Sequence, residues 1–260
     1  MKICPDNFRI NAHAGFSLVD VMVGMVIALL GVIIIFQVFS VSEGIKRTTT
    51  SGGDALQNGA SAMFALERSF RQAGYGVAIA PGAKVVITPG AVNTSDSIAV
   101  SYMPNWDFGS FLPNATNFPS AVPAAGALTT ETLHIVVTNN TPRLVSTVGG
   151  VDTIISEGIV LLKAEIGDDA NGDGVVDMWT QGAPANPLAV RIAVVARSVQ
   201  PEKPSVVGGP CDTTTPATAP TWIDSATVPL DLSGKVGLDP ADDWKCYRYK
   251  KFESAVPLRN

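Results

Sequence analysis

The sequence contains very little histidine and few charged residues. Its 260 residues include two histidines, His13 and His134, and only 16% are Asp, Glu, Lys or Arg. His134 lies in "TLHIVV", at an alternating position of a predicted strand, where a structural role is typical. No Ser/His/Asp or Cys/His arrangement can be assembled around it, and no glycine-rich phosphate loop is present. The sequence therefore predicts a protein that is not an enzyme.

An excess of basic residues is also missing. The chain has 18 Lys and Arg against 23 Asp and Glu, which gives a net charge of −5. Domains that bind nucleic acid usually carry clustered positive charge, because they neutralise phosphates. We therefore expect no nucleic acid among the partners.

Cysteine is scarce too, with Cys4 near the start of the chain and Cys211 and Cys246 far downstream. If Cys4 is removed, or remains in the cytoplasm while the rest of the chain is exported, Cys211 and Cys246 are left as an even pair. That count favours a Cys211–Cys246 disulfide in an oxidising compartment, and two independent buried thiols are the alternative. Closing a loop of about 35 residues would contribute roughly 3–4 kcal/mol in the chain-entropy treatment.

The chain does contain one long hydrophobic segment, residues 16–41. Every residue from Val21 to Phe36 is apolar or glycine. About 20 helical residues cross a hydrocarbon layer of about 30 Å, so this segment is long enough to be a transmembrane helix. Lys2 and Arg9 precede it, and the positive-inside rule then keeps residues 1–15 in the cytoplasm and exports the rest.

The flank of this segment differs from an ordinary secretory signal, since no Ala-x-Ala site follows Val41. Instead Gly15 comes directly before "FSLVD", residues 16–20. This order resembles the class III signal of type IV pilins and of type II secretion pseudopilins. The resemblance implies a leader peptide over 1–15, cleavage by prepilin peptidase between Gly15 and Phe16, and methylation of the new Phe16 amine.

Asp20 is the one acid near the start of the hydrophobic segment. A charge at the centre of a membrane helix costs roughly 2.5–3.5 kcal/mol on insertion scales. The resemblance implies that the N-terminal amine of a neighbouring subunit pairs with Asp20 and sets the register of filament assembly. Members of the family usually carry glutamate here, and aspartate is one methylene shorter. The alternative is a plain signal-anchor whose acid lies at the headgroup level.

Two features follow the hydrophobic segment. Residues 42–53, "SEGIKRTTTSGG", are poor helix formers, which predicts a hinge. Residues 54–73 predict an amphipathic helix with Asp54 as N-cap and Gly74 as the stop. Its expected apolar stripe consists of Leu56, Ala60, Met63, Leu66, Phe70 and Ala73.

Beyond Gly74 the pattern changes to strands rich in Val, Ile and Thr. They are expected over 84–88, 97–103, 132–138, 143–148, 151–155, 158–166 and 189–199. Residues 104–127 form a long loop whose aromatic residues either bind a partner or cover the core. The predicted fold class is α+β, and residues 54–260 form the globular domain. The resemblance implies a pilin-like arrangement, in which the transmembrane helix is followed by an amphipathic half-helix packed on an antiparallel sheet.

The stretch "DANGDGVVD", residues 169–177, carries a pattern of metal ligands. Asp169, Asn171 and Asp173 place oxygens at positions 1, 3 and 5, a glycine follows at 6, Val175 offers its carbonyl at 7, and Asp177 stands at 9. Such oxygen ligands suit Ca²⁺. Position 12 is Thr180 instead of glutamate, which predicts an affinity of roughly 10⁻⁴–10⁻³ M. The alternative is an acidic hairpin turn that binds nothing.

Two further stretches, "LERSFRQAGYG" and "YRYKKFESAVPLRN", resemble PilW-type minor pilins, and a C-terminal disulfide loop is common among pilins. The resemblance implies a minor pilin that primes assembly of the type IV pilus and sits at or near its tip. Its implied partners are prepilin peptidase, other minor pilins, the major pilin and a tip adhesin. The protein would start in the inner membrane, with its C-terminal domain periplasmic, and move to the pilus at the cell surface. The alternatives are a minor pseudopilin of type II secretion and a surface adhesin module on a filament.

Overall fold

The structure is a computed structural model of the chain. It describes residues 17–75, 83–91, 94–102, 128–139 and 141–202, then 209, 211, 213–215, 221–222, 230, 232 and 243–258. Gly15, Phe16 and the loop 104–127 lie outside the described residues. The chain divides into two compact units, Met1–Arg47 and Thr48–Asn260, and each is described by itself.

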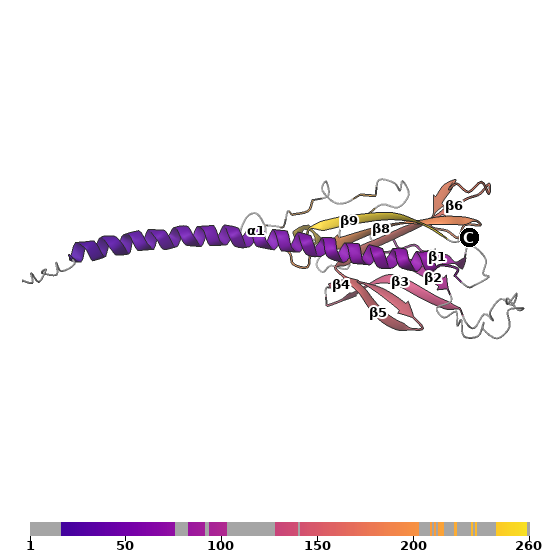
Figure 1. Cartoon of the computed structure of the whole chain (residues 1–260), viewed down its shortest axis with the longest axis horizontal. Coiled ribbons are helices and arrows are strands. Elements are labelled where there is room, and N and C mark those ends of the chain that lie inside the picture. Colours follow the sequence, from indigo (N-terminus) through magenta and orange to yellow (C-terminus); the bar gives the residue numbers. More distant parts are fainter. Residues whose placement is uncertain are drawn as a thin grey trace, which may run out of the picture. The chain divides into compact units, whose positions relative to one another are not determined.

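One helix, α1, runs from Leu18 to Gln72 over 55 residues (Figure 1). The predicted break over 42–53 is therefore wrong, and Asp54 lies inside the helix instead of capping it. The reason is that extending an existing helix adds one hydrogen bond per residue, whereas a Gly or Thr there costs only about 0.5–1 kcal/mol. Burial adds to this, since Ser51 and Ala55 are buried in the second unit.

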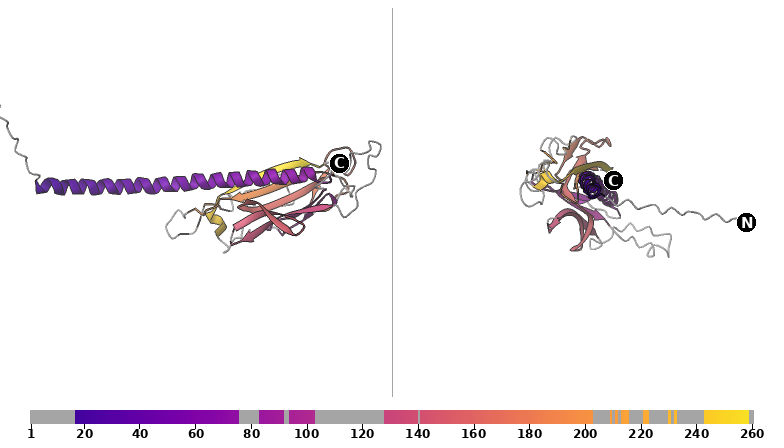
Figure 2. Two further views of the ribbon diagram at one scale, coloured as in Figure 1. Left: turned by 60° about the horizontal axis from the view of Figure 1, so that its bottom comes forward. Right: turned by 90° about the vertical axis from the view of Figure 1, so that its left-hand side faces the viewer.

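The strands of the second unit form two antiparallel sheets beside the C-terminal part of α1 (Figure 2). The first sheet has the order β1-β2-β3-β4-β5 and the second has the order β7-β6-β8-β9. The first comprises β1 (Val85–Thr88), β2 (Ser97–Tyr102), β3 (Thr129–Thr138), β4 (Thr141–Val148) and β5 (Val151–Glu157). The second comprises β6 (Ile159–Asp168), β7 (Met178–Thr180), β8 (Pro187–Arg197) and β9 (Tyr249–Pro257).

All seven strands predicted from the sequence are present, and the α+β class is confirmed. The arrangement differs from the expected single sheet, because the chain changes sheets at Gly158. This glycine lies between β5 and β6 with a φ of +74°, a conformation that side chains other than glycine rarely adopt. The strands β7 and β9 were not among those predicted from the residue pattern.

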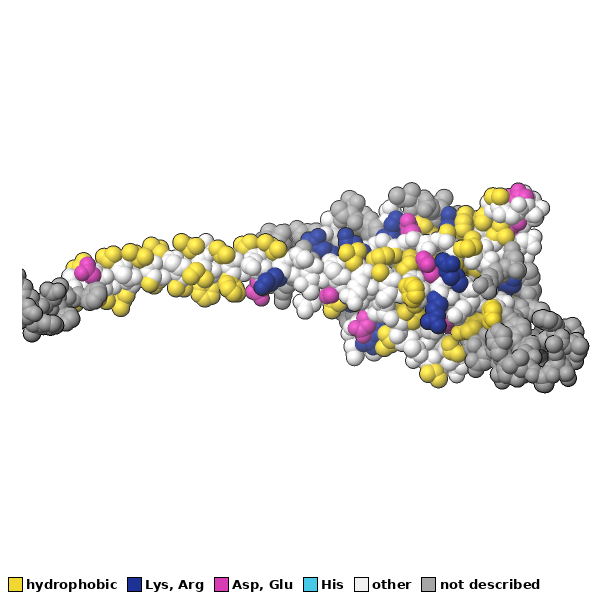
Figure 3. Space-filling model, viewed as in Figure 1, with side chains coloured by type: hydrophobic (Ala, Val, Ile, Leu, Met, Phe, Trp, Pro, Cys, Tyr) yellow, Lys and Arg dark blue, Asp and Glu magenta, His cyan; other side chains and the backbone are white. Residues whose placement is uncertain are grey.

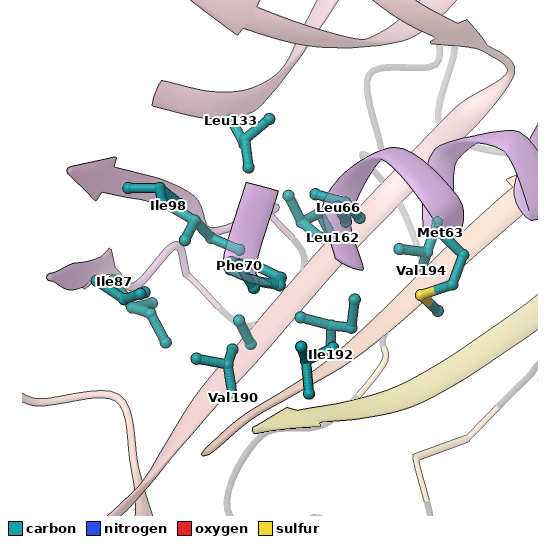
Figure 4. Packing of buried hydrophobic residues seen from close by; sticks show 14 of the residues in the cluster. Met63, Leu66, Phe70, Ile87, Ile98, Leu133, Leu162, Val190, Ile192 and Val194 are labelled. Carbon is teal, nitrogen blue, oxygen red and sulfur yellow. The ribbon is translucent and has the colours of Figure 1, made fainter. Parts of the chain in front are cut away.

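The main core lies where α1 meets both sheets (Figure 4). Leu66 and Phe70 of α1 are completely buried among residues of the two sheets, such as Ile98 and Ile192. Two polar contacts reinforce this packing. The Ser156 hydroxyl donates to the Asn58 carbonyl at 2.9 Å, and the Ser254 hydroxyl donates to Glu67 Oε1 at 2.6 Å. The helix is thereby fastened to β5 of one sheet and to β9 of the other.

The predicted apolar stripe of this helix is correct only in its second half. Met63, Leu66, Phe70 and Ala73 are buried, but Leu56 is 49% exposed and Ala60 is also exposed. The stripe continues towards the N-terminus through small residues instead, namely Ala62, Gly59 and Ala55. Small residues are typical where a helix approaches a sheet closely.

A second apolar cluster covers the other face of the second sheet. It consists of Val160, Leu161, Ala193, Val195, Trp222, Leu230, Leu232 and Trp244. The predicted disulfide between Cys211 and Cys246 is present and joins two parts of this C-terminal cover, with Cα atoms 4.9 Å apart. Cys246 ends the short 3-10 helix η4, Asp243–Cys246, which also carries Trp244.

Candidate functional site

The N-terminal part of α1 is apolar and exposed. Leu18–Glu43 is a 26-residue segment with a mean hydropathy of 2.9, and none of it is buried. Figure 3 shows hydrophobic side chains distributed along this part of the helix. The segment is long and apolar enough to cross a membrane by length and composition, so it is a candidate membrane anchor.

Asp20 lies in the first turn of α1 and is exposed. Its backbone N–H donates to the Ser17 carbonyl at 2.9 Å, and the Ser17 hydroxyl accepts a longer bond of 3.4 Å from Val19 N–H. Ser17 and Asp20 thus have the spacing of a capping box, and a carboxylate in the first turn is stabilised by the helix dipole by about 0.3–1 kcal/mol. This local role was not predicted, although "SLVD" carries its signal.

The structure brings the five predicted calcium ligands into the loop between β6 and β7. The Asp169 carboxylate is nearly buried and accepts three backbone bonds, from Gly172 at 2.6 Å, Asp173 at 3.1 Å and Gly174 at 2.9 Å. Gly172 and Gly174 have φ angles of +79° and +85°. These two glycines therefore allow the loop to turn around Asp169.

The other ligand residues are also held by hydrogen bonds within the loop. Asp173 Oδ1 accepts from Val175 N–H at 2.8 Å, and Asp177 Oδ2 accepts from Ala170 N–H at 2.9 Å. Asn171 donates to Asp173 at 3.1 Å. Within the described part of the chain, no three His, Cys, Asp or Glu side chains are grouped as for a metal. The predicted calcium site also uses the amide of Asn171 and the main-chain oxygen of Val175, which lie outside these four residue types. The calcium site therefore stays a prediction.

A buried ion pair between the two sheets was not predicted. Lys163 Nζ of β6 lies 2.9 Å from Oδ1 of Asp96, the residue before β2, and both side chains are at most 2% exposed. Asp96 Oδ2 also accepts from Ala164 N–H at 3.0 Å and from Gln181 Nε2 at 2.8 Å. The signal in the sequence is a lysine and a glutamate inside the apolar run "IVLLKAEIG".

A second buried acid, Glu165, lies two residues beyond Lys163 on β6. Glu165 Oε2 pairs with Arg191 Nη2 of β8 at 2.5 Å. The Arg191 guanidinium lies over two indoles, 4.5 Å from the centre of Trp179 and 5.5 Å from the centre of Trp222. Each such cation–π contact contributes about 0.5–2 kcal/mol. Arg191 therefore joins β7 and the C-terminal cover to the face of the second sheet.

The part of the C-terminal cover around Cys246 also contacts the second sheet through an arginine and an aromatic residue. The Arg197 guanidinium stacks 4.3 Å from the centre of the Tyr247 ring, and burial lowers the pKa of Arg197. Burial raises the pKa of Tyr249, whose hydroxyl donates to the Trp244 carbonyl at 2.8 Å. Arg197 and Tyr249 therefore each contact a residue within two positions of the disulfide-bonded Cys246.

No family model matches this chain, and no curated protein matches it. Among solved structures, a type IV-like pilin from Thermus thermophilus is 12% identical with a TM-score of 0.43. The match covers 79% of this chain and 94% of that one. This similarity is too low to assign the chain to a family.

Proposed function

We propose that the chain is a subunit of a type IV pilin-type filament, inserted in the inner membrane before assembly. The observation that carries the proposal is the 26-residue exposed apolar segment at the start of α1, directly after a "GFSLVD" stretch. The same helix continues to Gln72 and packs on antiparallel sheets. In the proposed function, prepilin peptidase removes residues 1–15 and methylates the Phe16 amine.

Assembly in this proposal depends on Asp20. Its carboxylate lies on an exposed part of the helix whose next acidic residue is Glu43. Leaving such a charge unpaired in hydrocarbon is costly, so a neighbouring subunit whose new Phe16 amine meets it gains stability only in the correct register. The capping-box spacing with Ser17 is compatible with this pairing, because a carboxylate has two oxygens and about four acceptor sites.

Within this class we propose a PilW-type minor pilin that primes pilus assembly together with other minor pilins. The stretches that resemble such chains lie at the end of α1 and along β9, where they contribute to the core through Phe70 and Val256. The partners are then prepilin peptidase and the other pilins, and the final location is at or near the pilus tip.

We also propose Ca²⁺ as a ligand of the loop formed by residues 169–177. The support is that the loop brings the predicted residues together around Asp169, with two glycines at positive φ. Calcium would add rigidity to a loop whose three acids, together with the adjacent Asp168 at the end of β6, otherwise repel one another. The competing interpretation, an acidic hairpin turn without metal, uses the same hydrogen bonds.

Filament assembly in the source cell tests the proposal. Replacing Asp20→Val is expected to abolish surface filaments, whereas Asp20→Glu, which keeps the charge, is expected to retain them. Normal filaments in the Asp20→Val strain would contradict the role of the carboxylate. A strain that lacks the chain separates the alternatives. Lost secretion with intact pili would indicate the type II secretion pseudopilin, and normal pili with lost adherence would indicate the adhesin module.

A further inference from the structure

Strand β5 forms an open edge of the first sheet. In the described part of the chain it pairs only with β4. The other edge strands are protected in ways that natural sheets commonly use. The strands β1 and β7 are only 4 and 3 residues long, and β9 carries Lys250 and Lys251. In contrast, β5 has seven residues, "VDTIISE", without lysine, arginine or proline.

The register identifies which backbone groups face outward. Gly149 and Gly150, with φ angles of +59° and +81°, form a two-residue hairpin between Val148 and Val151. In such a hairpin the flanking residues exchange hydrogen bonds, and the pattern then alternates along the strands. The N–H and C=O groups of Asp152 and Ile154 therefore point away from β4. No backbone hydrogen bond from another described residue reaches them.

Two apolar side chains of this edge are exposed. Val151 is 67% exposed and Ile154 is 52% exposed. Ile154 lies directly opposite Val145, which in turn lies opposite His134, so a cross-strand row on one face of the sheet ends at the open edge. An added strand would extend this row, and apolar side chains on facing strands stabilise a sheet.

We propose that the free edge of β5 accepts an extended strand from another subunit of the filament, a pairing that rests on the proposed function for the identity of that subunit. Outward-facing N–H and C=O groups at alternate residues match an extended backbone, which is the chemistry of β-strand addition. The edge has two acids. Glu157 is already paired with Arg143 at 3.0 Å, whereas Asp152 Oδ1 accepts only from the neutral Thr147 hydroxyl, at 2.6 Å, among the contacts of the described residues. The incoming strand therefore carries an apolar residue opposite Ile154 and Lys or Arg opposite Asp152.

A second copy of this chain fits the edge less well. Pairing β5 with β5 would bring two acidic strands together without a compensating base, and like charges on facing strands are destabilising. The charge of the edge thus favours a basic strand from a different chain.

Amide hydrogen exchange of the full chain in detergent tests the proposal directly. The probe is a capped peptide with the sequence of Tyr249–Pro257, "YKKFESAVP", which forms a strand in this protein and carries two lysines. The matched control peptide has both lysines replaced by glutamate. The lysine peptide is expected to slow exchange at Asp152 and Ile154 at least tenfold, and the glutamate peptide is expected to have no effect.

Three results would overturn the proposal. They are unchanged exchange with the lysine peptide, equal slowing by both peptides, and slowing that depends only on the concentration of the chain itself, which would assign the edge to a second copy. The readout needs no filament, so failure of the proposed function leaves it unaffected.

Two variants separate the edge from the fold. Asp152→Pro removes an outward N–H together with the carboxylate that would meet the incoming base, and it is expected to abolish the slowing of exchange at Ile154. The melting temperature should fall only slightly, since proline is tolerated on an open edge and the one bond lost within the chain, from Thr147 Oγ1, is exposed. Thr153→Pro removes an N–H that faces β4 and is expected to destabilise the chain.

In cells, Ile154→Lys is expected to reduce filament number at least tenfold, whereas Val86→Lys, a change at a 42% exposed valine of β1, is expected to have no effect. Equal effects of Ile154→Lys and Val86→Lys would contradict the proposal.

Discussion

The ring of Phe252 occupies the space in which a side chain on Gly59 would lie. A Cβ atom built on Gly59 would stand 1.9 Å from Cε2 of Phe252, well inside van der Waals contact. Gly59 is on α1 and Phe252 is on β9, so the absence of a side chain lets the helix approach the edge of the second sheet.

The first prediction concerns this close approach. Gly59→Ala should destabilise the protein by about 1–3 kcal/mol, because overpacking outweighs the gain of about 1 kcal/mol in helix propensity. Gly53→Ala is the matched control, since its Cβ would meet nothing within 4 Å, and it should stabilise the helix by up to about 1 kcal/mol. Urea unfolding of the full chain in detergent measures both. An increase in stability for both variants would refute the packing argument.

The buried pair between the sheets gives the second prediction. Lys163→Met should cost about 3–5 kcal/mol, because it leaves the Asp96 charge buried without its cation. Adding Asp96→Asn should recover part of that loss, since the neutral amide keeps an acceptor for the surrounding N–H groups.

The exposed pair Arg143–Glu157 supplies the control for this comparison. Its side chains are 29% and 55% exposed, so Arg143→Met should cost less than about 1 kcal/mol. Urea unfolding of the single and double variants gives the coupling energy. The account of the sheet junction is wrong if Lys163→Met is no more destabilising than Arg143→Met.

Calcium binding to the acidic loop is the third prediction. Titration calorimetry of the full chain should give a dissociation constant of roughly 10⁻⁴–10⁻³ M. The melting temperature should rise with calcium concentration, because a ligand that binds only the folded state stabilises it. Asp173→Ala should abolish both effects, whereas Asp152→Ala, which removes an acid outside the loop, should leave them intact. Flat titrations for the unchanged chain and for Asp173→Ala alike would exclude the site.

Local pattern predicted much of the fold but not its long-range features. The strands and the second half of the helix stripe follow from alternation and from three/four spacing, and the disulfide follows from counting cysteines. The helix across 42–53 was missed because weak propensities give way to propagation of the helix and to burial of Ser51. The sheet change at Gly158 and the Lys163–Asp96 pair depend on contacts between distant parts of the chain, which periodicity does not encode.

The candidate sites divide in the same way. The loop of residues 169–177 could be recognised from spacing, since its ligands are close in sequence. The open edge of β5 could not, because a strand becomes an edge only through the order of strands in the sheet. The contrast between "VDTIISE" and the two lysines of β9 has meaning only once both are known to be edges.

Mass spectrometry of the N-terminal peptide of the chain, recovered from the envelope and surface filaments of its source cell, tests the central claim most directly. The account predicts that the mature protein begins at Phe16 with a methylated amine, and that Gly15→Val blocks both cleavage and filament entry. Exported, functional protein that still carries residues 1–15 would contradict the account, because the amine that pairs with Asp20 would never form.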